Sequence, residues 1–131
     1  MGLIYADSCI VIYFVERHPA FHSLVPAAFA SISPAEIAIS PLVQAECLVS
    51  PMRRGDTALE RRFDSFFRRV TILSFTDSAF IDATRIRARH GLKLPDALHL
   101  ACAQHHGCAE LWTNDQRLSA AGGDLVKVLS P

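Results

Sequence analysis

Several features that would restrict this 131-residue chain to a specialised class are scarce or missing. It has no net charge, because 13 lysines and arginines are matched by 13 acidic residues, so it lacks the bulk positive charge with which many proteins hold nucleic acid. The longest apolar stretch near its start covers only residues 9–15, whereas a bilayer span needs about 20 residues. No repeat or low-complexity tract interrupts the sequence. We therefore expect a single domain over residues 1–131, without a membrane partner and located in the cytoplasm.

The chain also lacks any CxxC pair among its four cysteines, which are Cys9, Cys47, Cys102 and Cys108. The first three lie inside apolar runs, so they are predicted to be small buried side chains. A zinc site is an alternative, because His99, Cys102 and His106 follow one stripe of a predicted helix with Cys108 nearby, and zinc accepts such ligands. The two close ligand pairs that are usual in structural zinc sites are absent.

Short apolar segments alternate with longer amphipathic ones. Strands are predicted over residues 3–6, 36–39, 71–73, 111–113 and 125–129. Helices are predicted over residues 20–32, 41–49, 56–70, 76–91, 95–106 and 114–121, with a helix or turn over 8–15. Pro26 indicates a late start or a kink, and the helix over 41–49 should stop before Pro51. Strands separated by helices pair in parallel, so we expect an α/β three-layer sandwich with a central parallel sheet of about four to five strands.

Acidic residues recur where predicted strands end and helices begin. Asp7 directly follows the first strand, and Asp115 follows the strand over 111–113. Asp96 opens one helix, and Glu46 lies in the second turn of another, within a mostly apolar segment. Helix capping or the helix dipole explains Asp7, Asp96 and Asp115 when each is taken alone. Because ligands bind beyond the carboxyl ends of parallel strands, we expect the four carboxylates to share one edge of the sheet.

Such a group of carboxylates requires compensation. Four of them within about 6 Å would repel by roughly 3 kcal/mol per pair at an effective dielectric constant near 20. A divalent cation is the natural compensation, and ligation by oxygen alone suits Mg²⁺ or Mn²⁺. A cation held in this way can lower the pKa of a bound water and stabilise the leaving oxygen of a phosphodiester.

Four segments resemble, in this order, the acidic motifs of PIN-domain ribonucleases. They are Tyr5-Ala6-Asp7-Ser8, Leu42-Val43-Gln44-Ala45-Glu46, Leu94-Pro95-Asp96-Ala97-Leu98-His99-Leu100-Ala101 and Trp112-Thr113-Asn114-Asp115. The resemblance spans nearly the whole chain, and in length and spacing the chain is similar to the VapC-type toxins of toxin–antitoxin pairs. It implies a PIN-like fold, a Mg²⁺- or Mn²⁺-dependent endoribonuclease acting on RNA, a cognate antitoxin that neutralises it, and a homodimer.

The resemblance also implies a role for each matching residue. Asp7, Glu46, Asp96 and Asp115 would form the catalytic quartet. Asp7, Asp96 and Asp115 would ligate the metal, and Glu46 would complete the site or orient water. Supporting polar groups would be Ser8, Thr113 and Asn114. Arg117 stands where many relatives carry another Asp, a departure that bears on a second metal position.

Six arginines crowd the segment from residue 53 to residue 69: Arg53, Arg54, Arg61, Arg62, Arg68 and Arg69. One interpretation is a solvated face with helical ion pairs such as Asp64 with Arg68. The other is that they, with Arg53, Arg54, Arg61 and Arg62 foremost, grip RNA phosphates or an acidic antitoxin tail. Aromatic residues in the same segment could form an exposed surface for an antitoxin helix or a second subunit, or could pack in the core: Phe63, Phe66 and Phe67.

Two other functions stay open. A metal-free ribonuclease would use a pair of histidines and leave a cyclic phosphate, but none of the six histidines follows a predicted strand: His18, His22, His90, His99, His105 and His106. His99, one turn from Asp96, could instead support the acidic site. The second alternative is a non-catalytic PIN-like module that binds RNA or a protein, which loss of motif acids would mark; all four are present.

Overall fold

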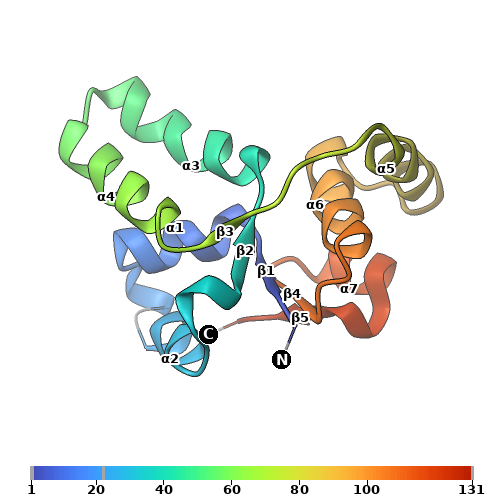
Figure 1. Cartoon of the computed structure of the whole chain (residues 1–131), viewed down its shortest axis with the longest axis horizontal. Helices are drawn as coiled ribbons and strands as arrows, with labels where there is room; N and C mark the ends of the chain where they lie inside the picture. Colours follow the sequence, from blue (N-terminus) through green and yellow to red (C-terminus); the bar gives the residue numbers. More distant parts are fainter. Residues whose placement is uncertain (1, 22, 131) are drawn as a thin grey trace.

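The centre of the molecule is a parallel sheet of five strands in the order β3-β2-β1-β4-β5 (Figure 1). The computed structural model describes residues 2–21 and 23–130. The strands are β1 (Ile4–Ala6), β2 (Ile37–Ile39), β3 (Thr71–Ile72), β4 (Glu110–Thr113) and β5 (Val126–Val128). Every strand pair is parallel. The predicted parallel sheet is thus confirmed.

Helices cover both faces of this sheet, which confirms the three-layer sandwich. They are α1 (Ser8–Glu16), α2 (Leu24–Ala30), α3 (Pro41–Arg54), α4 (Thr57–Phe67), α5 (Asp77–His90), α6 (Leu94–His105) and α7 (Gln116–Gly122). Short 3-10 turns lie at Pro19–Phe21, Pro34–Glu36 and Gly123–Leu125. Helices α1 to α4 pack together on one side, and α5 to α7 on the other (Figure 1). No helix in the described part of the chain is long and apolar enough to cross a membrane.

Local sequence signals fix where most helices begin. Asp7 caps α1, and its side chain accepts a hydrogen bond from the Ser8 amide. Ser40 caps α3 ahead of a proline in the first turn, and its hydroxyl accepts from the Val43 amide. These caps satisfy amide groups that have no partner within the helix. Two residues that the site uses, Asp7 and Ser40, are therefore held in place by the helix starts that they cap.

Two predicted helix boundaries differ in the structure. The end of α3 before Pro51 is wrong, because the helix continues through Pro51 to Arg54 and stops at Gly55, which adopts a φ of 67°. Pro51 removes one backbone hydrogen bond, but its side chain is buried in the core-facing stripe of the helix. The predicted helix over 20–32 divides into a 3-10 turn and α2, which places Pro26 in the first turn of α2 and confirms the late start.

The aromatic residues of α4 belong to the core. Phe63, Phe66 and Phe67 are 0%, 9% and 6% exposed. The three side chains together therefore do not form an exposed docking surface, and core packing holds, while Phe66 also lines a pocket at the surface. Their stripe follows the helical repeat, and it faces α1 across the helical layer.

The cysteines behave mostly as predicted. Cys47 and Cys102 are buried, as is Cys108, while Cys9 is only partly buried, and all four thiols are free. Burial raises the pKa of the Cys9 and Cys102 thiols to about 12. Thiols with such a high pKa are protonated and unreactive at neutral pH.

Candidate active site

The site lies where the two central strands end. Strands β1 and β4 are neighbours, with Ala6 opposite Trp112. The chain proceeds from β1 to β2 and β3 on one side, while β4 and β5 lie on the other. This is the point at which strand order reverses, and ligands of open α/β sheets bind there. Asp7 follows β1, and Asp115 lies two residues beyond the end of β4.

The Asp7 carboxylate is fixed by hydrogen bonds at both oxygens. Oδ1 accepts from the Ser8 amide at 2.7 Å, and Oδ2 accepts from the Thr113 hydroxyl at 2.8 Å. The same Thr113 oxygen accepts from the Asp115 amide at 3.2 Å. Thr113 therefore ties the ends of β1 and β4 together and sets where Asp7 lies relative to the first turn of α7.

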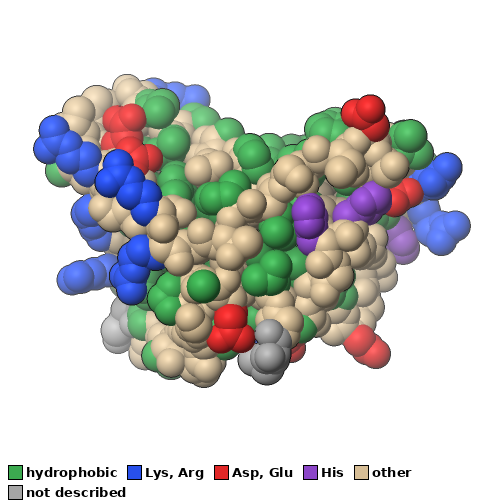
Figure 2. Space-filling view, viewed as in Figure 1, with side chains coloured by type: hydrophobic (Ala, Val, Ile, Leu, Met, Phe, Trp, Pro, Cys, Tyr) green, Lys and Arg blue, Asp and Glu red, His purple; other side chains and the backbone are tan. Residues whose placement is uncertain are grey.

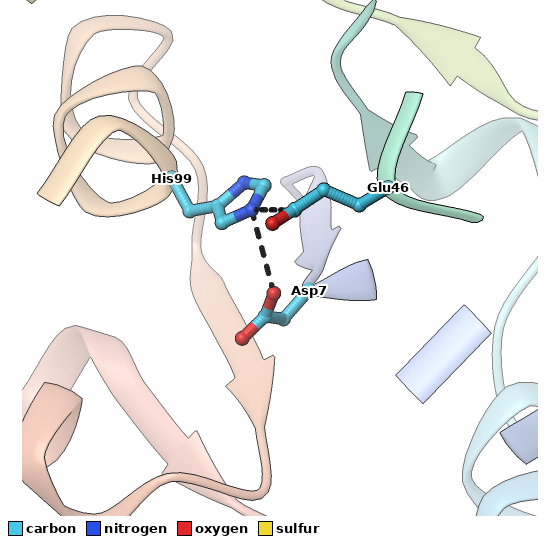
Figure 3. A group of neighbouring side chains, drawn as sticks. All are labelled: Asp7, Glu46 and His99. Atoms are coloured by element: carbon cyan, nitrogen blue, oxygen red, sulfur yellow. Dashed lines mark hydrogen bonds and ion pairs between the residues drawn. The ribbon is translucent and has the colours of Figure 1, made fainter. Parts of the chain in front are cut away.

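Glu46 reaches the site from α3 and meets His99 from α6 (Figure 3). The His99 Nε2 lies 2.6 Å from Glu46 Oε1 and 3.6 Å from Asp7 Oδ1. The His99 side chain is only 1% exposed, whereas that of Glu46 is 33% exposed. A buried imidazole thus stands between two acids that come from different elements.

The other ring nitrogen of His99 is also bonded. Its Nδ1 lies 2.7 Å from the Tyr5 hydroxyl, which lies 2.8 Å from the hydroxyl of Ser40. Burial is the main reason that the pKa of Tyr5 lies well above its usual value, so this phenol stays protonated. The buried polar or charged side chains of the described residues are Asp7, Ser40, His99 and Thr113. All four belong to this one network around the acids.

The pKa values of the pair reflect their contact. Burial alone would raise the pKa of Glu46, but the hydrogen bond and the charge of His99 outweigh it and lower that pKa. Burial alone would lower the pKa of His99, but the hydrogen bond to Glu46 and the charges of Asp7 and Glu46 raise it. Glu46 is therefore ionised at neutral pH, and His99 holds its protons more firmly than a free imidazole does.

Asp96 interacts by charge with both Asp7 and Asp115. Burial, followed by the negative charges of Asp7 and Asp115, raises the pKa of Asp96. Asp115 is held differently, because its hydrogen bonds with Arg117 lower its pKa. The Arg117 guanidinium lies 3.0 Å from Asp115 Oδ2. The residue that departs from the family pattern thus pairs with a motif acid.

The side chains present suit a divalent cation. One ligand atom from each of Asp7, Glu46 and His99 lies within 4.8 Å of the other two. Asp96 and Asp115 are not part of this group, but burial and the negative charges of Asp7 and Asp115 disfavour the ionised form of Asp96, and a nearby cation would offset that repulsion. Because both ring nitrogens of His99 are already hydrogen-bonded, the carboxylates are the groups that could hold a cation, and carboxylates suit Mg²⁺ or Mn²⁺.

The remaining predicted residues take different positions. Ser8 contacts Asp7 through its amide and hydroxyl, while Asn114 instead donates to the Tyr13 hydroxyl at 2.6 Å. Arg53, Arg54, Arg61 and Arg62 are all exposed, and Figure 2 shows basic side chains gathered on the side formed by α3 and α4. Arg62 donates to the carbonyl of Val15.

The zinc hypothesis is wrong for these described residues. His99 turns its Nε2 to Glu46, whereas His106 donates to the Ser74 carbonyl at 2.8 Å. His105 pairs with Asp82 at 2.7 Å, away from the acids. Among the described histidines, His99 is the one that contacts the motif acids, which leaves no pair of histidines there for acid–base work. His22 lies outside the described residues.

Sequence reasoning missed two members of the network, Tyr5 and Ser40. Tyr5 lies within the first predicted strand, and Ser40 directly precedes the helix predicted over residues 41–49, so each has a purely structural role that hides its part in the network. The available signal was a polar group in a buried position, because Tyr5 and His99 each lie among apolar neighbours. A buried polar group needs a partner, but the sequence does not name that partner.

Comparison with known proteins identifies the family of the chain. The family model of the PIN domain matches residues 4–124. The chain belongs to the PIN-domain family. No curated protein matches.

Solved structures share this PIN fold. A chain of a toxin–antitoxin complex from Klebsiella pneumoniae has a TM-score of 0.78 and 24% identity, covering 97% of each chain. VapC20 from Mycobacterium tuberculosis, described as a sarcin–ricin loop cleaving toxin, has a TM-score of 0.75 and 20% identity, covering 98% of this chain and 99% of its own. A chain of VapBC2 from Rickettsia felis has a TM-score of 0.75 and 16% identity, covering 96% and 98%. At these identities, the likeness is one of fold.

Proposed function

We propose that this PIN domain is a metal-dependent endoribonuclease and the toxin of a toxin–antitoxin pair. The observation that carries the proposal is the approach of motif acids from separate elements around the junction of β1 and β4. Asp7 and Asp115 both act by charge on Asp96, and Asp7, Glu46 and Asp96 all act by charge on His99. A PIN-family member that retains all four acids has what metal-assisted phosphodiester hydrolysis requires. VapC20, which shares the fold, is described as a sarcin–ricin loop cleaving toxin.

In this proposal Asp7, Asp96 and Asp115 would hold Mg²⁺ or Mn²⁺, and Glu46 would orient the attacking water. The cation, when bound, supplies a lowered water pKa and stabilisation of charge on the leaving oxygen. Glu46 is suited to take the proton from that water, because its lowered pKa keeps it ionised. The water oxygen would bond to phosphorus as the bond from phosphorus to the 3′ oxygen breaks. The departing 3′ oxygen would take a proton from solvent, and Glu46 would release to solvent the one it accepted, so that the products carry a 5′-phosphate and a 3′-hydroxyl.

An antitoxin segment is the proposed protein partner, since several structures with this fold are toxin–antitoxin complexes. A pocket of about 630 Å³ suits such a segment. Its lining combines apolar and basic side chains: Phe14, Pro26, Phe66, Arg17, Arg62 and Arg69. A lining that combines apolar side chains with arginines fits an amphipathic segment that carries acidic side chains. Of the four arginines singled out by sequence, Arg62 is the one that lines this pocket.

A homodimer completes the proposal. Large apolar side chains are exposed on two helices, with Val49 and Met52 on α3 and Phe80 and Ile81 on α5, each between 48% and 57% exposed. Such side chains favour burial at an interface. Light scattering of the purified protein should give the mass of a dimer, and a monomer at micromolar concentration would refute this part.

Cleavage of total cellular RNA by the purified, partner-free protein tests the central proposal. We expect discrete fragments with Mg²⁺ or Mn²⁺, none with EDTA, and none from folded Asp7→Asn or Asp96→Asn. Asp82→Asn is the matched control, because Asp82 is an acid that pairs with His105 outside the site, and it should cleave as the natural protein does. Metal binding and RNA binding without cleavage would instead favour the non-catalytic module.

A further inference from the structure

The hydrogen-bond chain from Ser40 through Tyr5 to His99 ends at Glu46, and it joins three elements, α3, β1 and α6, beside the acidic site. Ser40 begins α3, Tyr5 lies in β1, His99 lies in α6, and Glu46 is one and a half turns along α3. None of the buried side-chain nitrogen or oxygen atoms described lacks a partner. A fully satisfied hydrogen-bond chain that runs through the core to a carboxylate of the site can fix the position of that carboxylate as well as stabilise the fold.

The proton positions in this chain follow from its chemistry. A carboxylate can only accept, so at 2.6 Å from Glu46 the His99 Nε2 must carry a hydrogen. If the ring is neutral, its Nδ1 is then an acceptor, and the Tyr5 hydroxyl must donate to it while Ser40 donates to Tyr5. If the ring is cationic, Nδ1 donates to Tyr5, and Tyr5 donates to Ser40. Two hydroxyls in series can serve both states, whereas a backbone carbonyl could serve only the second.

The form that this arrangement excludes is the neutral ring with its hydrogen on Nδ1. That form would place the Nε2 lone pair against the Glu46 carboxylate, and two acceptors at 2.6 Å repel. The Glu46 carboxylate therefore keeps an N–H on Nε2 in either protonation state of His99. The Tyr5 and Ser40 hydroxyls give Nδ1 a hydrogen-bond partner in both states, which holds the ring in this orientation.

We infer that His99 is a positioning residue that holds the Glu46 carboxylate beside Asp7, and that Tyr5 and Ser40 hold the ring in the orientation that directs Nε2 at Glu46. This rests on the proposed function, in which Glu46 orients the attacking water. Without the His99 N–H, the part-exposed Glu46 side chain is free to turn to solvent, and the water loses its proton acceptor. Outer partners of this kind usually contribute 10- to 100-fold to activity or metal affinity.

The first test is the ring form of His99 in the metal-free protein, read from its ¹⁵N shifts by NMR. We expect a hydrogen on Nε2 in the natural protein from pH 6 to 9, and a mixture of ring forms in Tyr5→Phe, which lacks only the hydroxyl. A neutral ring with its hydrogen on Nδ1 in the natural protein would overturn the inference. This readout needs neither bound metal nor cleavage.

The second test compares kcat and KM for RNA cleavage at saturating Mn²⁺. We expect His99→Leu to lower kcat by about 10- to 100-fold with KM unchanged. His99→Gln, whose amide can donate to Glu46, should recover most of kcat, and Tyr5→Phe should lie between the natural protein and His99→Leu. His105→Gln is the matched control. His105 lies on the same helix as His99 but pairs with Asp82 of α5, outside the site, so this substitution should leave kcat unchanged.

The outcomes separate this inference from the proposed function. A folded His99→Leu with natural kcat, or a folded His99→Gln as slow as His99→Leu, would overturn the positioning role while leaving the nuclease intact. If His99→Leu does not fold, Tyr5→Phe decides, and a natural kcat together with a natural ring form would overturn the inference. A natural protein that neither binds Mn²⁺ nor cleaves RNA would overturn the proposed function, and the role of His99 with it.

Discussion

Replacing Asp96 with Asn should stabilise the metal-free protein while abolishing cleavage. The pKa of Asp96 is raised, first by burial and then by the charges of Asp7 and Asp115. An acid whose pKa is higher in the folded state favours folding when it is protonated, and this contribution is lost as the pH rises through that pKa. At neutral pH the ionised Asp96 therefore lowers the free energy of unfolding, and the neutral amide of Asn does not.

The size of the effect follows from the charges involved. Two like charges about 6 Å apart repel by roughly 1 kcal/mol in a water-like medium and by about 3 kcal/mol at an effective dielectric constant near 20. Asp96 is part-exposed, so screening by solvent favours the lower figure. For a chain of 131 residues, about 1 kcal/mol corresponds to a rise in Tm of roughly 3–5 °C.

Thermal denaturation followed by circular dichroism, with and without Mn²⁺, measures both the gain in metal-free stability and the loss of stabilisation by the cation. Mn²⁺ at 100 times its Kd should stabilise the natural protein by about 2.7 kcal/mol. Asp96→Asn, which lacks a proposed ligand, should gain much less, so the order of the two Tm values should reverse when Mn²⁺ is added. Asp82→Asn is again the control, since Asp82 has a lowered pKa that arises mainly from its hydrogen bond to His105, and its loss should not raise Tm.

Two results would refute this reasoning. A folded Asp96→Asn with a Tm below that of the natural protein in EDTA would show that the Asp96 charge is not repelled by its neighbours. Equal stabilisation of both proteins by Mn²⁺ would show that Asp96 does not take part in holding the cation.

Three further predictions concern other parts of the molecule. Arg117→Ala frees Asp115 from an exposed ion pair, and because such pairs contribute about 0.2–1 kcal/mol, Mn²⁺ titration calorimetry should show slightly tighter binding; weaker binding would contradict this. His99 has a raised pKa, so its contribution to metal-free stability is present below about pH 6.5 and lost as the pH rises through the folded-state value; urea unfolding from pH 6 to 9 should show a decline that folded His99→Gln lacks. Phe63→Ala should cost about 3–5 kcal/mol in urea unfolding, and a loss below 1 kcal/mol would contradict a core position.

Much of the fold was accessible from sequence because its signals are local. Apolar strands alternate with capped amphipathic helices, and this pattern specifies parallel pairing whatever the exact ends of each element. The predicted end of α3 before Pro51 was wrong. Proline lacks the amide hydrogen that the helix would use, which favours an end there, but burial of the Pro51 side chain supports the longer helix. The α4 aromatic residues could be assigned to the core only once the packing of α1 against α4 was known.

The acids of the site could be predicted from the sequence for a similar reason, since Asp7, Asp96 and Asp115 stand next to a strand end or a helix start and Glu46 lies in the second turn of a helix. The hydrogen bonds through His99 that connect Glu46 to Tyr5 could not be predicted. His99 and Glu46 are 53 residues apart, and Tyr5 and His99 are 94 apart. No spacing rule connects such residues, and the apolar neighbours of His99 are equally typical of a packed core. Only the parallel sheet, which brings β1, α3 and α6 to one edge, reveals the network.

The most direct test of the central claim is the chemistry of the ends that the purified protein leaves on RNA. With Mn²⁺ present, we predict fragments that carry a 5′-phosphate and a 3′-hydroxyl, and no fragments from folded Asp96→Asn or in EDTA. Fragments that end in a cyclic phosphate and form equally well in EDTA would contradict a metal-dependent mechanism and would instead indicate acid–base catalysis without metal.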